Sequence, residues 1–141
     1  MRAIGLDFGS KTVGVAVTDD LGLTAISLEI IRREREGHLR KTCARIEEII
    51  RERGIDTVVL GLPLNMNGSE GERAKKTREF AGMLKRRTGI EPVFVDERLT
   101  TVEADEIIKL TGNHKKDRKA HIDSMAAAII LEDYLNGKDR I

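Results

Sequence analysis

The chain has 141 residues, of which 40% are hydrophobic and 35% are charged, and its formal net charge is +1 at pH 7. This length suffices for one domain that buries about two-thirds of its unfolded surface, so we expect residues 1–141 to form a single domain. No apolar run approaches the roughly 20 residues that span a bilayer, and the start MRAIGLDFG lacks the apolar core of a secretion signal. The single cysteine, Cys43, excludes an internal disulfide and favours a cytoplasmic location.

The first predicted elements are two apolar runs, at 3–6 and 13–17, separated by a polar turn. This pattern predicts an antiparallel hairpin. Strand alternation places Asp7 on the same face as Ala3 and Gly5, whose small size lets a helix approach closely. A carboxylate there is costly unless it faces water, a cation or a hydrogen-bond donor. Asp7 is therefore a candidate functional residue.

The rest of the chain alternates between strand and helix patterns, with a polar, basic and mobile loop expected at 111–120. Two helices are expected to open with a capping box, Ser69 with Glu72 and Thr100 with Glu103. This order predicts an α/β fold with a mixed five-stranded sheet, made of a three-stranded antiparallel meander plus two parallel strands, and helices on both faces. The elements expected after the hairpin are strands at 23–31, 57–62 and 92–95, and helices at 38–54, 69–88, 100–110 and 121–136.

Three carboxylates occur at the ends of predicted elements. Asp7 ends the first strand, Glu97 follows the last strand, and Asp123 lies in the first turn of the alanine-rich final helix, which we expect to cover the small-residue face. The carboxyl ends of parallel strands meet at one edge of a sheet, so these groups can converge. Three close carboxylates repel one another unless a cation compensates them, and Mg²⁺ or Mn²⁺ suits such ligands. Each residue alone is equally typical of a turn, a helix cap or a surface charge.

Four blocks of the sequence, in this order over nearly the whole chain, closely resemble the YqgF family: LDFGSKTVGVAV, GLPLNMNG, VDERLTTVEA and HIDSMAAAIIL. Proteins of that family have an RNase H-like fold and were described first as Holliday-junction-resolvase-like and later as nucleases that mature precursor small-subunit ribosomal RNA. The resemblance implies a nuclease dependent on Mg²⁺ or Mn²⁺, with precursor 16S rRNA as the expected substrate. Its catalytic and metal-binding residues would be Asp7, Glu97 and Asp123. Related resolvases have a fourth acidic position, for which Asp96 is only a second choice.

Several polar residues near these carboxylates are candidates for contacts with nucleic acid. Because the net charge is close to zero, a polyanionic partner would need a local basic patch, although the run at 115–119 is equally typical of a solvated loop. The loop after 57–62 offers amides and a predicted helix N-terminus, although a turn and a capped helix explain it equally well. The basic candidates are Lys11, Arg98, Lys115, Lys116, Arg118 and Lys119, and the loop candidates are Asn65, Asn67, Gly68 and Ser69.

Other functions stay open on the sequence alone. The same carboxylates suit a Holliday junction resolvase acting on branched DNA, and the fold also suits a non-catalytic nucleic-acid-binding or regulatory module. The segment DFGSKTVG resembles the first phosphate loop of actin-like and sugar-kinase ATPases, but those enzymes need two such lobes. We expect a nucleic-acid partner and no membrane. A monomer and a homodimer are both compatible with the sequence, as are endonucleolytic and exonucleolytic cleavage.

Overall fold

The computed structural model describes residues 1–97 and 115–137, and the side chains of residues 1–97 and 125–137. The predicted helix at 100–110 lies outside these residues. The elements in chain order are β1 (Ala3–Phe8), β2 (Thr12–Thr18), β3 (Ala25–Arg32), α1 (Arg40–Arg53), β4 (Thr57–Leu62), α2 (Glu72–Thr88), β5 (Val93–Asp96) and α4 (Lys115–Leu135).

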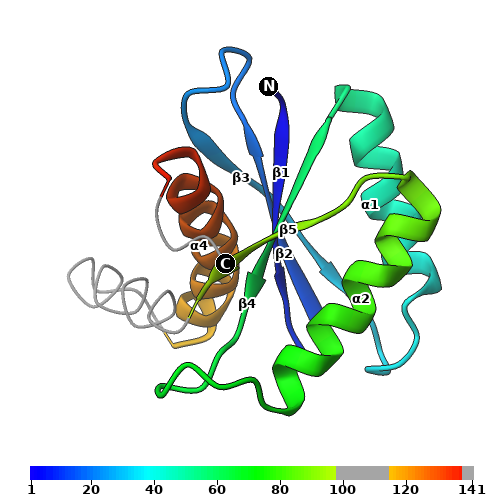
Figure 1. Ribbon diagram of the computed structural model, residues 1–141, viewed down its shortest axis with the longest axis vertical. Coiled ribbons are helices and arrows are strands. Elements are labelled where there is room, and N and C mark those ends of the chain that lie inside the picture. Colours follow the sequence, from blue (N-terminus) through cyan, green and yellow to red (C-terminus); the bar gives the residue numbers. More distant parts are fainter. Residues whose placement is uncertain (98–114, 138–141) are drawn as a thin grey trace.

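A five-stranded sheet in the order β3-β2-β1-β4-β5 forms the centre of the molecule. β2 runs antiparallel to both β1 and β3, whereas β1 with β4 and β4 with β5 are parallel pairs. Figure 1 shows α1 and α2 on one face of the sheet and α4 on the other. The predicted fold class is therefore confirmed. The edge at which β1, β4 and β5 all end is called the carboxyl edge below.

Alternate residues of the strands face two separate apolar cores. Ile4, Leu6 and Phe8 of β1 belong to the larger core, which α1 and α2 cover. Ala3 of β1 belongs to the smaller core beneath α4. This alternation is the two-residue period of an extended strand. The smaller core contains Ala3, Ala16, Val59, Val95, Ala127, Ile130 and Leu131.

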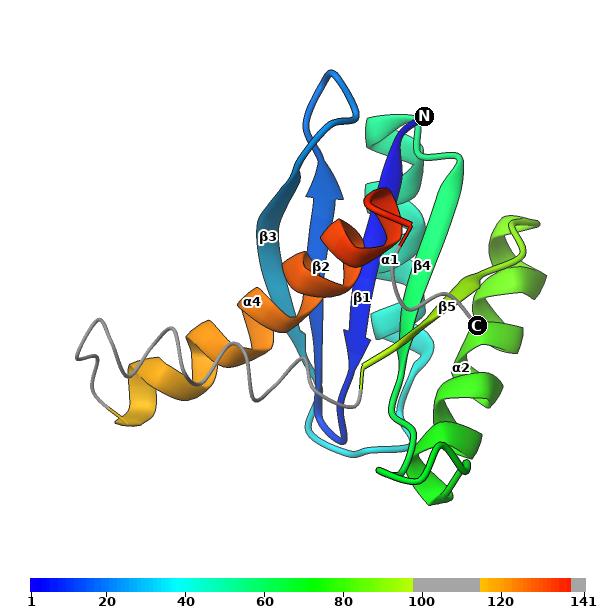
Figure 2. The ribbon, with the colours of Figure 1, turned by 60° about the vertical axis from the view of Figure 1, so that its left-hand side comes forward.

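The small-residue face of β1 lets α4 approach the sheet closely, as predicted. A Cβ atom added to Gly5 would lie 2.7 Å from Cβ of Leu131 and 2.9 Å from the carbonyl oxygen of Ala127. Figure 2 shows α4 lying across the face formed by β1, β2 and β3. The alanine-rich helix is therefore the partner of this face.

The predicted start of α2 is wrong. The helix begins at Glu72 with Gly71 as N-cap, so Ser69 does not cap it. Ser69 instead closes the preceding turn, where its N–H and its hydroxyl donate to Oδ1 of Asn67 at 3.0 and 2.6 Å. An asparagine side chain can accept hydrogen bonds from the residue two positions later, and a serine in that position then need not cap a helix. The local turn therefore competes successfully with the capping box.

The predicted loop at 111–120 is also wrong from residue 115 onward, because α4 already begins at Lys115. Lysine, arginine and alanine are strong helix formers, and neither glycine nor proline interrupts the chain between residue 115 and Gly137. Residues 111–114 lie outside the described part of the chain. In the part that the structure describes, no helix is long and apolar enough to cross a membrane.

β3 begins at Ala25, two residues later than predicted. Oδ1 of Asp19 accepts hydrogen bonds from the backbone N–H groups of Leu23 at 2.8 Å and Thr24 at 3.3 Å. Gly22 adopts a positive φ of 69° within the same turn, a conformation that glycine adopts without strain. The turn therefore extends into the apolar run that the sequence pattern assigned to the strand.

Candidate active site

Asp7 lies near the end of β1, at the carboxyl edge, between two glycines. It pairs with Gly14 of β2. In β4 its neighbour is Gly61, because Leu6 pairs with Leu60 one residue earlier. Neither neighbour has a side chain that could fill the space over this part of the sheet. The strand register therefore leaves room beside the Asp7 carboxylate for another group.

Glu97 follows β5 and fills part of this space. Its backbone N–H donates to the carbonyl oxygen of Leu62 at 3.2 Å, which extends the pairing of β4 and β5 by one residue. Its carboxylate lies over Gly61, where an added Cβ atom would be 2.5 Å from Oε2. Glycine at position 61 thus permits the glutamate side chain to lie on the sheet.

The carboxyl groups of Asp7 and Glu97 are hydrogen-bonded to each other. Burial and the neighbouring Asp7 charge raise the pKa of Glu97 well above its ordinary value, while the guanidinium of Arg73 acts in the opposite direction. Two carboxyl groups in direct contact share a proton when no cation is present, because both cannot ionise at low cost. The structure thus brings Asp7 and Glu97 together at the ends of their strands, and their catalytic and metal-binding roles stay a prediction.

Asp123 is in α4, one helical turn before Ala127, whose carbonyl oxygen lies against Gly5. Gly5 and Asp7 share one face of β1. The predicted position in the first turn of the helix is wrong, since α4 begins at Lys115 and Asp123 is more than two turns further along. The side chain of Asp123 lies outside the described residues, so its place in the site stays a prediction.

The donor set of the site suits a hard divalent cation. Carboxylate oxygens are the preferred protein ligands of Mg²⁺ and Mn²⁺, and a cation between Asp7 and Glu97 would replace the proton that they share. The described side chains contain no group of three metal-ligating residues. A third protein ligand would have to come from elsewhere in the chain, and Asp123 is the predicted one.

The structure describes only some of the other predicted contact residues. Lys11 is exposed in the turn between β1 and β2. The loop candidates Asn65, Asn67 and Ser69 follow β4, and their side chains bond to one another at 2.6 to 3.0 Å. Gly68 lies in the same turn with a φ of 86°. Arg98 lies outside the described residues. Lys115, Lys116, Arg118 and Lys119 belong to α4, and their side chains are not described.

Sequence reasoning missed a group of charged residues beside this edge, which we call the Glu36 cluster: Arg33, Glu36, Arg73 and Lys76. Arg73 Nη2 donates to the carbonyl oxygen of Phe8, the residue directly after Asp7, at 3.1 Å. No spacing could have indicated the cluster, because its two halves come from the segment after β3 and from α2. Only the fold brings them together.

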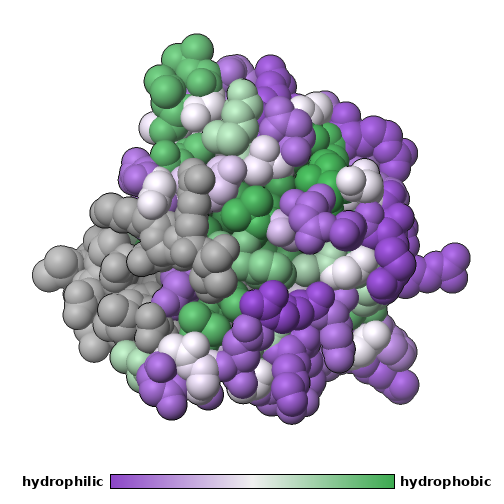
Figure 3. Space-filling model, viewed as in Figure 1, coloured by the Kyte–Doolittle hydropathy of each residue, from purple (hydrophilic) through white to green (hydrophobic). Residues whose placement is uncertain are grey.

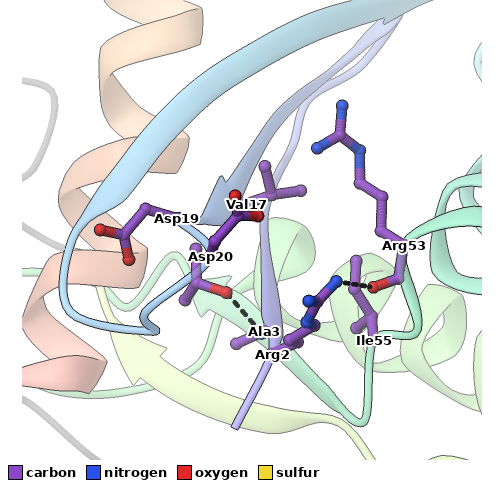
Figure 4. A pocket seen from close by; sticks show the side chains of 8 residues that line it. Arg2, Ala3, Val17, Asp19, Asp20, Arg53 and Ile55 are labelled. Carbon is purple, nitrogen blue, oxygen red and sulfur yellow. Dashed lines mark hydrogen bonds between the residues drawn. The ribbon is translucent and has the colours of Figure 1, made fainter.

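The small pocket drawn in Figure 4, of about 40 Å³, is at the opposite edge of the sheet. Ala3 at the start of β1 and Thr18 at the end of β2 line it, whereas Asp7 is near the end of β1. This pocket is therefore separate from the carboxylate pair. Its lining residues are Arg2, Ala3, Val17, Thr18, Asp19, Asp20, Arg53 and Ile55.

The sheet order and the helices on both faces define an RNase H-like fold, and solved structures agree. Thermus thermophilus RuvC in complex with a Holliday junction substrate matches with a TM-score of 0.60 and 17% identity, covering 100% of this chain and 99% of that chain. The Fowlpox virus resolvase in complex with Holliday junction DNA matches with a TM-score of 0.56 and 11% identity, covering 97% of this chain and 98% of that chain. At these identities the likeness shows the fold.

The family follows from the sequence comparisons. The family model described as "RuvX: Holliday junction resolvase" matches residues 1–137. The "Putative pre-16S rRNA nuclease" of Agathobacter rectalis is 57% identical over 96% of this chain and 95% of its own length, and the relative of the same name from Lachnospira eligens is 51% identical over 99% of this chain and 100% of its own. The chain therefore belongs to the RuvX family, which is the YqgF family that its motifs resemble. It is a nuclease, an enzyme that acts on phosphodiester bonds.

Proposed function

We propose that this nuclease matures precursor 16S rRNA, with Asp7, Glu97 and Asp123 as its catalytic and metal-binding residues. The observation that carries the proposal is the contact between the carboxyl groups of Asp7 and Glu97 at the carboxyl edge. The names of the two relatives supply the substrate. A purely structural carboxylate pair would gain nothing from being held together, because each raises the cost of ionising the other.

Asp7, Glu97 and Asp123 would hold Mg²⁺ or Mn²⁺, whose chemistry in such sites is to activate water and stabilise the leaving oxygen of a phosphodiester. The protein positions the two described carboxylates by different means. β1 holds Asp7 through its pairing with β2 and β4, and the backbone bond to Leu62 holds Glu97. Gly61 keeps the space between them free of a side chain.

The charges around the carboxylates govern their protonation. For both carboxyl groups to act as ligands of a cation, the proton between them would have to leave. The guanidinium of Arg73 favours the ionised form of Glu97, since it opposes the rise in the pKa of that carboxyl group. Arg73 thus favours the form of Glu97 that binds a cation.

Substrate binding would run through the sugar-phosphate backbone, which presents the same charges whatever its base sequence. The proposed contacts are Lys11, Arg98 and the basic residues 115, 116, 118 and 119, with Asn65, Asn67, Gly68 and Ser69 as further substrate contacts. Lys11 is exposed at the carboxyl edge, which supports its part in this proposal. We place the enzyme in the cytoplasm, where ribosomal RNA is matured.

A second candidate substrate is branched DNA, because the family description names a Holliday junction resolvase. Incubating the purified protein with precursor 16S rRNA, junction DNA and single strands, each in Mn²⁺ and in EDTA, separates the candidates. We expect metal-dependent cleavage of the rRNA precursor. Cleavage of junction DNA alone would assign the resolvase activity, and binding without cleavage of any substrate would indicate a non-catalytic module.

A further inference from the structure

Two cations of the Glu36 cluster converge on a single carboxylate oxygen. Arg73 Nη1 donates to Oε1 of Glu36 at 2.8 Å, and Lys76 Nζ donates to the same oxygen at 3.0 Å. The three side chains are between 36% and 40% exposed, so solvent reaches them. One anionic oxygen held by a guanidinium and an ammonium group is the arrangement in which proteins also bind a phosphate oxygen.

The cluster holds more positive than negative charge, because neutral groups anchor its arginines. The guanidinium groups of Arg33 and Arg73 lie 5.0 and 5.5 Å from the ring centroid of Phe8. A ring face attracts a cation without neutralising it. The cluster thus contains the three cations Arg33, Arg73 and Lys76 around the single carboxylate of Glu36.

Backbone carbonyl groups also hold Arg33 without neutralising its charge. Its Nη2 donates to the carbonyl oxygens of Gly9 at 2.7 Å and Ser10 at 2.8 Å, and its Nε donates to that of Glu36 at 2.9 Å. Among the described residues, its buried Nη1 has no hydrogen-bond partner. Leaving a buried donor of a charged group without a partner costs folding free energy. A further anion near Arg33 would therefore be favourable.

The cluster is next to the carboxylate pair. Arg73 donates to the carbonyl oxygen of Phe8 at 3.1 Å, and Arg33 donates to those of Gly9 and Ser10. Together the two arginines hold the three residues that directly follow Asp7. A nucleic-acid strand whose scissile phosphate lies at Asp7 and Glu97 carries further phosphates a few ångströms away on either side.

We propose that Arg73 and Lys76 bind a backbone phosphate of the nucleic-acid substrate, and that Glu36 occupies this phosphate site in the free protein. The inference rests on the proposed function for its ligand class. Substrate binding exchanges the Glu36 carboxylate for a phosphate oxygen on the same two cations. Arg33 holds the turn after Asp7 and adds positive charge.

The test is fluorescence anisotropy with a fluorescein-labelled RNA hairpin and a labelled DNA four-way junction, in EDTA, over a series of salt concentrations. Glu36→Gln keeps the shape of the side chain and removes the competing charge, so both probes should bind about two- to fivefold more tightly. The double variant Arg73→Met with Lys76→Met should bind more weakly, and its salt slope should fall by about one for each phosphate that it no longer neutralises.

Glu29 and Arg45 provide matched controls, because they form a comparable ion pair between β3 and α1, with Arg45 Nη2 and Glu29 Oε1 2.6 Å apart and exposures of 37% and 30%. Glu29→Gln and Arg45→Met should leave the affinity and the salt slope at the values of the unmodified protein. Thermal melts of every variant identify any that fail to fold. Unchanged or weaker binding by folded Glu36→Gln, or an unchanged salt slope in the folded double variant, would overturn the proposal.

Cleavage in Mn²⁺ is measured separately, so the two proposals can fail independently. A protein that binds both probes as expected but cleaves nothing contradicts the nuclease mechanism and leaves the phosphate site supported. A protein that cleaves but shows no effect of Glu36→Gln contradicts the phosphate site alone. Failure of the unmodified protein to bind either probe would also overturn the phosphate site.

Discussion

At the scale of single residues, the proposed function rests on the contact between the carboxyl groups of Asp7 and Glu97. Among the described residues, the pKa values of Asp19, Glu36 and Glu70 lie below the ordinary value, each chiefly because the carboxylate accepts a hydrogen bond. Glu97 is shifted upward by burial and by Asp7. A carboxyl group held in this way in the absence of a cation destabilises the folded chain at neutral pH.

We expect Glu97→Gln to be more stable than the unmodified protein in EDTA at neutral pH. Because the folded-state pKa of Glu97 lies above the ordinary 4.5, the folded chain binds more protons than the unfolded chain between the two values. Its contribution to stability is therefore present below pH 4.5 and lost as the pH rises through the folded-state pKa. Urea unfolding of both proteins over a pH series measures the difference.

Carboxylates with lowered pKa values contribute stability that is lost as the pH falls. Because both proteins contain these carboxylates, this contribution cancels when their stabilities are compared. The stability advantage of Glu97→Gln should therefore grow from acidic to neutral pH. An advantage that does not change with pH would contradict the raised pKa of Glu97.

Gly61 is the residue that leaves room for the Glu97 carboxylate over β4. Gly61→Ala places a Cβ atom 2.5 Å from Oε2 of Glu97 and also against Ile130. We expect a loss of stability of about 1–3 kcal/mol from overpacking and a loss of cleavage of about a hundredfold from displacement of the carboxylate. Gly37→Ala is the matched control, because a Cβ atom there meets nothing within 4 Å. Equal activity of the two variants would show that Glu97 need not lie over β4.

The residue pattern alone predicted the pairing of Asp7 with Glu97, because both follow strands that end at one edge. It could not predict Arg73, which acts on Glu97 and on the Phe8 carbonyl from α2. Arg73 belongs to no motif and is one of 25 lysines and arginines. Its role depends on where α2 packs, which is a property of the tertiary structure.

At the scale of elements, the strands were predicted within about two residues and the helix starts less well. The prediction that the alanine-rich helix α4 packs on the small-residue face of β1 was correct. Close packing requires small residues on both sides, as at Gly5 and Ala127. The start of α2 was misplaced because Ser69 bonds to Asn67. The start of α4 was misplaced because a polar, charged segment reads equally well as a loop or an exposed helix.

The basic start of α4 gives a prediction at this scale. Replacing Lys115, Lys116, Arg118 and Lys119 together with alanine removes charge and retains helix propensity, since alanine is the best helix former. If these residues bind phosphates, the salt slope of RNA binding should fall by up to about 0.9 for each phosphate that is no longer neutralised. Anisotropy titrations at several salt concentrations measure it, with circular dichroism as the control for helix content. An unchanged slope would assign the four residues to a solvated surface.

At the scale of the whole molecule, the described surface has an apolar patch away from the carboxyl edge. Figure 3 shows an apolar patch at one end of the molecule. In the turn between β2 and β3, Leu21 and Leu23 are 78% and 70% exposed. This turn is at the opposite edge of the sheet from Asp7. The net charge of +1 supplies no general attraction for nucleic acid. Binding would therefore depend on local groups at the carboxyl edge.

The order of elements and the mixed sheet followed from the sequence because the runs had a period of two or of 3.6 or, as at 57–62, were short, continuous and apolar like a strand covered on both faces. The oligomeric state did not follow, and a monomer and a homodimer both stay predictions. The position of Asp123 relative to Asp7 likewise stays a prediction at the level of side chains. Asp7 is thus the residue whose replacement tests the site most directly.

The decisive measurement compares Asp7→Asn with the unmodified protein in thermal melts, with and without Mn²⁺, beside cleavage of precursor 16S rRNA. Asparagine keeps the shape of the side chain and removes one ligand charge, and it relieves the repulsion with Glu97. The unmodified protein should gain about 2.7 kcal/mol from Mn²⁺ at a hundredfold excess over its Kd. The folded variant should melt higher in EDTA, gain little from Mn²⁺ and cleave nothing, whereas retained cleavage or an equal gain from Mn²⁺ would contradict the metal-dependent site.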